Sequence, residues 1–196
     1  MVDADWQPLA QHWLTDGTEP DFQPGWARIS WNKNFLLYEA VLIGANARNS
    51  AQKLNEYTYD LGDVCEIFIE AKDGSHYLEL HVTPENQRLQ LHWPFDGLAQ
   101  VRAGQAKLEA FMVADPDWVR TSTHVAPGYW AVQAMIPVEI LGLPPSPLTP
   151  RTKLATTVCR YDYTARKKPT LSATACFPAP SFHRRADWHS LALLPS

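Results

Sequence analysis

The alternation of apolar and polar side chains with a period of two is the feature that most constrains the fold of this chain. Because successive side chains of a strand point to opposite faces, such alternation is typical of strands that bury one face. The alternating runs cover residues 26–31, 35–43, 63–70, 75–83, 87–93, 108–114, 118–124, 129–136, 153–161, 172–177 and 188–194, and turn residues separate them. This density of short strands predicts an all-β fold, an antiparallel β-sandwich of the jelly-roll or immunoglobulin-like kind.

Two short helical segments are expected beside these strands. In residues 5–14, apolar side chains recur at the spacing of one helical face, which predicts a short N-terminal helix or turn. Near residues 136–142, Pro137 and Gly142 frame a second helical turn, because proline favours the first helical position and glycine the end. The predicted fold class is therefore all-β with one or two short helices.

We expect a single domain over residues 1–196, with a lead-in at 1–25 and the sandwich at 26–194. A chain of 196 residues can bury one sizeable core and is short for two. The proline-rich stretch 143–150 is the best candidate for a boundary, but a cut there would leave the strands on either side without a partner sheet. We interpret this stretch as a loop within the domain.

The composition argues against several classes of protein. The chain is 45% hydrophobic and 19% charged, which is typical of a globular protein and not of a disordered one. No apolar run approaches the roughly 20 residues of a membrane helix, and the N-terminus lacks the pattern of a secretory signal. We therefore expect a soluble, cytoplasmic protein with no membrane partner.

Charge and cysteine content narrow the expected partners further. The formal net charge is −4, which argues against nucleic-acid binding, although residues 1–150 carry 9 basic and 19 acidic side chains and residues 151–196 carry 8 and 2. We interpret this asymmetry as two regions of one domain. The 3 cysteines lie far apart without the spacing of metal ligands, which predicts reduced thiols and no structural zinc.

A polar face on a predicted hairpin is the most informative feature for function. The runs 75–83 and 87–93 flank a short turn, and pairing Thr83 with Arg88 across four turn residues places hydrogen-bonding side chains of both strands on one face. These side chains are Glu79, His81, Gln90 and His92, with Glu79 opposite His92 and His81 opposite Gln90. Glu66, on the preceding strand, extends this face if the two strands are neighbours.

The residues alone leave three interpretations of this face open. Directional donors and acceptors beside aromatic rings suit a saccharide or similar polyol, because hydroxyls need such partners and the C–H face of a sugar stacks on a ring. His81, His92 and Glu79 are also competent metal ligands. A solvated outer face of an antiparallel sheet explains the alternation as well. Acids in predicted turns can ligate calcium, although turn and cap roles are commoner for isolated aspartates: Asp60, Asp63 and Asp73.

The sequence contains no established catalytic motif. It lacks a Gly-x-Ser-x-Gly elbow, a phosphate-binding loop and a His-Glu-x-x-His pair. Glu66 and Glu79 on neighbouring strands can meet the separation needed for glycoside hydrolysis, so a hydrolase stays as an alternative. We interpret His183 as a residue that satisfies a buried turn, and we assign no catalytic residue.

Motifs from about residue 26 to 194 occur in the order of a known family. They are Leu61-Gly62-Asp63-Val64-Cys65-Glu66-Ile67-Phe68-Ile69, Tyr77-Leu78-Glu79-Leu80, Thr83-Pro84-Glu85-Asn86, Trp130 through Ile136-Pro137 with Leu141-Gly142, Val158-Cys159-Arg160-Tyr161, Leu171-Ser172-Ala173 and Ser181-Phe182-His183. In these motifs the sequence resembles the DOMON-like domains related to family 9 carbohydrate-binding modules. The resemblance implies a β-sandwich whose concave sheet, in the sugar-binding members, holds a sugar between two Trp rings and polar side chains.

The resemblance also implies binding positions. Glu66 matches the acidic position of the family, Glu79 and His81 fall where binding members place Arg and Asn, and Gln133 lies on the strand that supplies a further polar contact. The aromatic clamp differs, because Tyr59 stands near one Trp position and the late loop has no Trp. With the hairpin residues, the predicted ligand-binding set is Tyr59, Glu66, Glu79, His81, Gln90, His92, Gln133 and Arg160.

We therefore expect a non-catalytic domain like a carbohydrate-binding module, which binds a saccharide or polyol on a concave sheet face. The alternatives are a structural or protein-interaction sandwich without a sugar ligand and, third, a hydrolase acting on carbohydrate. Strand patterns assign four of the 8 tryptophans to the core, namely Trp31, Trp93, Trp130 and Trp188. The other four are freer, and one of them can rim the concave face: Trp6, Trp13, Trp26 and Trp118.

Overall fold

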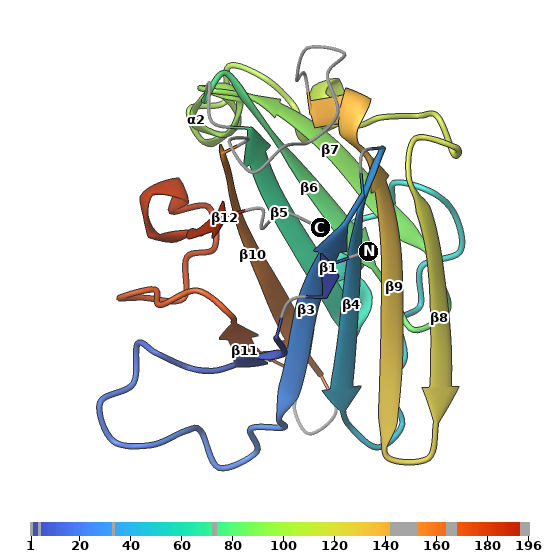
Figure 1. Cartoon of the computed structure of the whole chain (residues 1–196), viewed down its shortest axis with the longest axis vertical. Helices are drawn as coiled ribbons and strands as arrows, with labels where there is room; N and C mark the ends of the chain where they lie inside the picture. Colours follow the sequence, from blue (N-terminus) through green and yellow to red (C-terminus); the bar gives the residue numbers. More distant parts are fainter. Residues whose placement is uncertain are drawn as a thin grey trace.

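Two antiparallel β-sheets packed face to face form the protein. The computed structural model describes residues 2–3, 5–32, 34–71, 74–141, 153–163 and 168–192. Figure 1 shows β3, β4, β9 and β8 side by side in one layer and β10, β5, β6 and β7 in the layer behind. The predicted all-β sandwich is confirmed.

The two sheets contain six strands each among the described residues. Sheet A has the order β1-β3-β4-β9-β8 with β2 paired to β3, and sheet B has the order β11-β10-β5-β6-β7 with β12 paired to β10. The strands of sheet A are β1 (Val2–Asp3), β2 (Gln7–Leu9), β3 (Gly25–Trp31), β4 (Phe35–Ile43), β8 (Arg120–Ala126) and β9 (Tyr129–Pro137). The strands of sheet B are β5 (Val64–Ala71), β6 (His76–Val82), β7 (Arg88–Pro94), β10 (Lys153–Asp162), β11 (Thr170–Ala173) and β12 (His189–Ala192).

The helices of the described chain are short. They are the α-helices α1 (Thr58–Leu61) and α2 (Gly97–Arg102) and the 3-10 helices η1 (Leu108–Phe111), η2 (Val138–Leu141) and η3 (Arg185–Asp187). The predicted turn after Pro137 is confirmed as η2. No helix within the described ranges has the length and apolar character needed to span a bilayer.

The N-terminal segment differs from the predicted helix. Residues 7–9 form the edge strand β2, with Gln7 paired to Ala27 and Leu9 to Gly25, and a turn follows at residues 12–13. An edge strand tolerates Pro8, which has no backbone N–H to donate. The apolar spacing has another cause, because Leu9 is buried in the sandwich and Trp13 packs against Phe182.

One predicted strand is wrong and others have shifted ends. The run at 108–114 contains η1, whose Phe111 packs on Trp93 at a centroid distance of 4.9 Å. Its apolar residues 108 and 111 lie one 3-10 turn apart, so they share a face without a strand. The run at 172–177 is a strand only to Ala173, and the proline-rich stretch 143–150 lies outside the described residues.

Sheet B is covered on both faces, which places a potential site under a layer of loops. Its inner face packs against sheet A in one core that includes Leu36, Ile67 and Leu80. Its outer face carries a second core, in which Phe68 and Trp93 pack with residues of the later loops. The outer face of sheet A has no such cover among the cores formed by described residues.

The β6–β7 hairpin has a register one residue away from the predicted one. Val82, not Thr83, pairs with Arg88, so the loop has five residues, 83–87. Asn86 adopts a positive φ of 62°, and the backbone N–H of Gln87 donates to the Thr83 hydroxyl at 3.0 Å. A shift of one residue moves every side chain of a strand to the other face. Side chains of β7 therefore meet those of β6 differently from the prediction.

Candidate functional site

A hollow of about 320 Å³ opens on the outer face of sheet B, and we call it the sheet B hollow. Strands β5, β6, β7 and β10 form its floor, while α1, α2, η1 and the loop 180–183 form its walls. Its polar side chains are Glu66, Glu79, His81, Arg102, Ser181 and His183, and its aromatic ones are Tyr59, Trp93, Tyr161 and Phe182.

An imidazole held between two carboxyl groups forms the floor of this hollow. The β5–β6 register places Glu66 directly opposite His81, and Glu79 follows on the same face of β6. The Nε2 atom of His81 lies 2.7 Å from Glu79 Oε1 and 3.3 Å from Glu66 Oε1. Its Nδ1 atom lies 2.9 Å from the hydroxyl of Thr58 on α1. Both nitrogens of the ring are engaged, so its orientation is fixed.

Glu79 is the most heavily bonded group of the site. The indole N–H of Trp93 donates to Glu79 Oε2 at 2.6 Å, while His81 engages Oε1. His183 Nε2 lies 3.8 Å from Glu79 Oε2, and the other ring nitrogen of His183 lies 3.0 Å from the Tyr77 hydroxyl. This carboxylate is therefore held in one position by three elements of the chain.

Burial and neighbouring charges separate the two carboxyl groups in acidity. Burial raises the pKa of Glu66 to about 7; attraction to His81 opposes this rise and repulsion from Glu79 adds to it. Burial also raises the pKa of Glu79, but attraction to His183 and hydrogen bonds from His81 and Trp93 outweigh burial, so that the pKa is lowered. Near neutral pH, Glu66 is partly protonated and Glu79 is a carboxylate.

The pKa values of the two histidines of the hollow shift in opposite directions. Burial alone would lower the pKa of His81, but attraction to Glu66 and Glu79 outweighs burial and raises it. Burial lowers the pKa of His183, although Glu79 opposes this effect. Burial also raises the pKa of Tyr59 to about 12, so its hydroxyl stays neutral. The hollow can thus offer a carboxylate acceptor, a titratable carboxyl and neutral donors.

Of the acids that were candidate calcium ligands, Asp60 is exposed on α1 and Asp63 has a structural role. Asp63 accepts the backbone N–H groups of Arg48 at 3.1 Å and Tyr163 at 3.2 Å, which ties three segments together. Asp73 lies outside the described residues. Within the part of the chain that the structure describes, no three His, Cys, Asp or Glu residues are arranged to hold a metal ion.

The structure brings four of the eight predicted residues together and separates the others. Tyr59, Glu66, Glu79 and His81 line the sheet B hollow, and their role in binding stays a prediction. Gln90 is not in the hollow, because the register turns it to the other face of β7, where its amide donates to the carbonyls of Val113 and Asp115. His92 lies on that same face and stacks on His76 at 5.0 Å.

Arg160 and Gln133 are also misplaced by the prediction. Arg160 is buried on the inner face of β10, with Nη2 3.1 Å from Asp162 Oδ2 and Nη1 donating to the Gln23 carbonyl at 3.3 Å. Gln133 lies on the exposed face of sheet A and donates to Glu39 at 3.1 Å. Alternation gives two faces for a strand, but it does not say which sheet the strand joins.

Sequence reasoning missed six polar or aromatic residues of the hollow as functional residues: Trp93, Arg102, Tyr161, Ser181, Phe182 and His183. Trp93 is buried as predicted, and it also holds Glu79; the correct hairpin register would have shown this, because it puts both side chains on one face. Tyr161, Phe182 and Arg102 carried no signal in the sequence that links them to Glu79. Of the four freer tryptophans, none lines the sheet B hollow, and Trp6 lines a hollow of sheet A.

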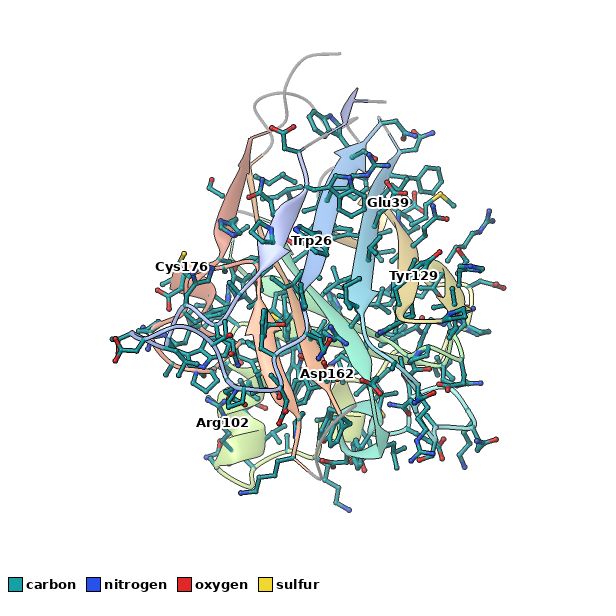
Figure 2. The ribbon with its side chains drawn as sticks, turned by 90° about the horizontal axis from the view of Figure 1, so that it is seen from below. Trp26, Glu39, Arg102, Tyr129, Asp162 and Cys176 are labelled. Atoms are coloured by element: carbon teal, nitrogen blue, oxygen red, sulfur yellow. The ribbon has the colours of Figure 1, made fainter. Side chains whose placement is uncertain are left out.

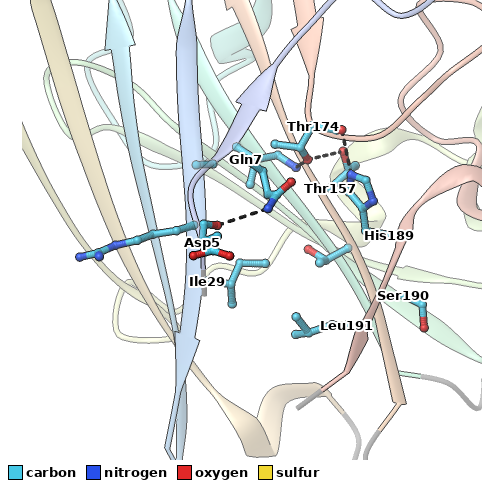
Figure 3. Close-up of a pocket in the computed structure, with 12 residues that line it drawn as sticks. Asp5, Gln7, Ile29, Thr157, Thr174, His189, Ser190 and Leu191 are labelled. Carbon is cyan, nitrogen blue, oxygen red and sulfur yellow. Dashed lines mark hydrogen bonds between the residues drawn. The ribbon is translucent and has the colours of Figure 1, made fainter. Parts of the chain in front are cut away.

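A separate hollow of about 250 Å³ lies at the open edge between the two sheets, beside β3 and β12 (Figure 3). Ile29 and Leu191 contribute apolar walls, and several of the polar groups contact one another. His189 Nε2 lies 2.8 Å from the Thr174 carbonyl oxygen, and the hydroxyls of Thr157 and Thr174 are 3.3 Å apart. Among the described residues, no Trp, Tyr or Phe ring lines this hollow, whereas four such rings line the sheet B hollow, so we regard the sheet B hollow as the better candidate.

Solved structures with this fold include carbohydrate-binding proteins. No protein-family model matches the sequence, and no curated relative was found. A proposed carbohydrate-binding protein from Bacteroides uniformis matches with a TM-score of 0.75 and 15% identity, over 96% of this chain and 85% of that chain.

Family 9 carbohydrate-binding modules from Caldicellulosiruptor kristjanssonii match as well. The complex with cellotriose has a TM-score of 0.59 and 12% identity, over 94% of this chain and 76% of that chain. The complex with glucose has a TM-score of 0.56 and 14% identity, over 88% and 74%. The chain therefore has the fold of family 9 carbohydrate-binding modules, as the resemblance implied.

Proposed function

We propose that this chain is a non-catalytic carbohydrate-binding domain and that a saccharide occupies the sheet B hollow. One observation carries the proposal: a fixed carboxylate, a titratable carboxyl and aromatic rings face one hollow on a sheet. Sugar hydroxyls need directional partners, and the apolar face of a sugar packs on aromatic rings. The fold neighbours bound to cellotriose and glucose support this class of ligand.

The residues of the hollow have distinct proposed roles. Glu79 accepts sugar hydroxyls, because His81 and Trp93 fix its carboxylate in advance and little side-chain entropy is lost on binding. Glu66 donates or accepts according to its protonation. The half-buried rings of Tyr59 and Tyr161 provide the surface for the sugar face.

The size of the hollow favours a small ligand. Its volume of about 320 Å³ lies at the lower end of the roughly 300–1,000 Å³ that is typical of small-molecule sites. Loops cover the outer face of sheet B on several sides. We therefore propose a mono- or disaccharide, or the end of a longer chain.

The geometry favours binding over hydrolysis. In a glycosidase the two carboxyl groups flank the bond that is cleaved. Here the Nε2 atom of His81 lies 2.7 Å from Glu79 and 3.3 Å from Glu66, so an imidazole takes the place that the glycosidic bond would need. This arrangement supports a non-catalytic role.

Isothermal titration calorimetry with glucose, xylose, cellobiose and cellotriose tests the proposal. We expect binding by the native chain and a loss of roughly tenfold to 100-fold in Glu79→Gln, because a hydrogen bond to a charged group contributes about 1.5–3 kcal/mol. Glu139→Gln makes the same chemical change at an exposed position on η2 and should bind like the native chain.

Two outcomes would contradict this proposal. Absence of binding to all four sugars by the native chain would remove the saccharide ligand. Release of glucose from cellotriose by the native chain, lost in Glu79→Gln, would show a hydrolase.

A further inference from the structure

The outer face of sheet A carries a hydrogen-bonded row that the sheet B hollow does not use. By strand register, β3, β4, β9 and β8 place four polar side chains in one row: Arg28, Glu39, Gln133 and Ser122. Arg28 Nε donates to Glu39 Oε2 at 2.6 Å, and Gln133 Nε2 donates to Glu39 Oε1 at 3.1 Å. The Ser122 hydroxyl donates to Gln133 Oε1 at 3.4 Å. The row is a continuous chain of bonds across four strands.

A second row of mainly apolar residues lies beside the first, and the two residues in its middle have short side chains. The same registers align Trp26, Val41, Ala131 and His124. A hollow of about 340 Å³ lies over these two short side chains, Val41 and Ala131. We call it the sheet A hollow. Glu39, Gln133 and Ser122 line one side of it, and His124 lines it as well.

Large aromatic side chains stand exposed on this part of the sheet. Trp6 is 41% exposed, Trp26 38% and Tyr129 37%. Trp26 and Tyr129 come from β3 and β9, two strands of sheet A (Figure 2). The ring of Trp6 lines the hollow and lies 4.8 Å from the guanidinium of Arg28, while Tyr129 packs against His124 at 6.2 Å. Clustered exposed apolar groups with a polar rim mark interaction sites.

We propose that the sheet A hollow is a second saccharide-binding surface, which takes an uncharged oligosaccharide laid across the strands. Arg28 and Glu39 neutralise each other, so the row offers hydrogen bonds without favouring an anion or a cation. Glutamine, serine and carboxylate groups match hydroxyls, and the exposed rings match the C–H faces of sugars. The hollow is open along the sheet, so a ligand longer than a disaccharide can continue over neighbouring residues.

The two hollows are separate, so this proposal does not rest on the function proposed for sheet B. The sheets pack with their inner faces together, the two hollows lie on the opposite outer faces, and no residue lines both of them. A variant in one hollow therefore leaves the other intact.

NMR titration of the ¹⁵N-labelled full chain with cellohexaose and xylohexaose tests the second surface. In Glu79→Gln, we expect at least one of these sugars to shift the amides of Val41, Ala131 and Gln133. In Trp26→Ala, we expect the affinity at these amides to fall roughly threefold to tenfold, since one aromatic contact contributes about 0.5–1.5 kcal/mol. Trp26 lies beside the hollow, paired with its lining residue Val41. Val125 pairs with the core residue Trp130 and so faces away from the hollow, and Val125→Ala should not change the affinity.

Three outcomes would overturn the proposal. The first is that neither hexasaccharide shifts the sheet A amides at millimolar concentration. The second is that the shifts occur with equal affinity in Trp26→Ala. The third is that analytical ultracentrifugation finds a dimer that Trp26→Ala dissociates, which would assign this face to a second copy of the chain.

Discussion

Replacing Glu66 by glutamine removes a titratable proton from the floor of the sheet B hollow and nearly preserves the shape of the side chain. Glu66 is 3% exposed, and burial raises its pKa to about 7 from an ordinary value of 4.5. The native state therefore binds this proton more tightly than the unfolded chain does. The resulting stability is fully present below about pH 4.5 and is lost as the pH rises through about 7.

The expected size of this effect follows from the difference in pKa. One pKa unit corresponds to about 1.36 kcal/mol, so the native chain should lose about 2 kcal/mol of unfolding free energy through Glu66 between about pH 5 and 6.5. Glutamine has no such proton. The free energy of unfolding of Glu66→Gln, relative to that of the native chain, should therefore rise by about 2 kcal/mol over this range. The pKa of His81 is raised above 6.5, so its own loss of stability falls above this window.

Urea denaturation followed by circular dichroism at four pH values from about 5 to 6.5 measures this difference. Equal dependence of the free energy on urea in both proteins would show that they unfold alike. A difference that stays constant across the window would refute the argument, because Glu66 would then be ionised in the native state throughout. Infrared spectroscopy offers an independent check. At about pH 6 the carboxylic-acid carbonyl absorption should be stronger in the native chain than in the variant, where Asp63, whose pKa burial raises to about 6, still contributes.

Two other substitutions and one labelling experiment test the packing of the chain. Trp93→Phe removes the indole donor to Glu79 and should lower the free energy of unfolding by about 1–3 kcal/mol, measured by urea denaturation. Gly62→Ala should cost roughly 1–3 kcal/mol in the same assay, because Gly62 has φ +143° and a Cβ there would meet the carbonyl oxygen of Arg48; unchanged stability would contradict this. Titration with a thiol reagent should label Cys176 alone in the native chain, and the two buried cysteines as well in urea.

The sandwich was predictable from sequence because its strands alternate cleanly. The run at 35–43 matches β4, whose burial alternates along its whole length, and the run at 129–136 matches β9. Glu66, Glu79 and His81 share a face because two adjacent strands alternate in phase. Local alternation predicted the fold class and placed Glu79 and His81 together, and it added Glu66 on the condition that the two strands are neighbours.

The rest of the site depends on contacts that local pattern does not encode. The loop 83–87 takes one more residue than predicted, with Asn86 in the left-handed region, and this single residue moved Gln90 and His92 off the face. Gln133 was assigned to the site because its strand alternates, yet β9 pairs with β4 in sheet A. Arg160 is a buried charge beside Asp162, which alternation alone would place on either face.

The position of the two hollows on opposite outer faces of the sandwich determines how many separate ligand molecules one chain could bind. Packed sheets lie about 10 Å apart, and hollows on their outer faces open in opposite directions. A short ligand in one hollow cannot reach round the sandwich to the other, so the two would not act together on one molecule as linked sites do. A chain with both hollows filled would instead join two separate glycan molecules. It would therefore cross-link a polysaccharide in solution, and this cross-linking can be measured.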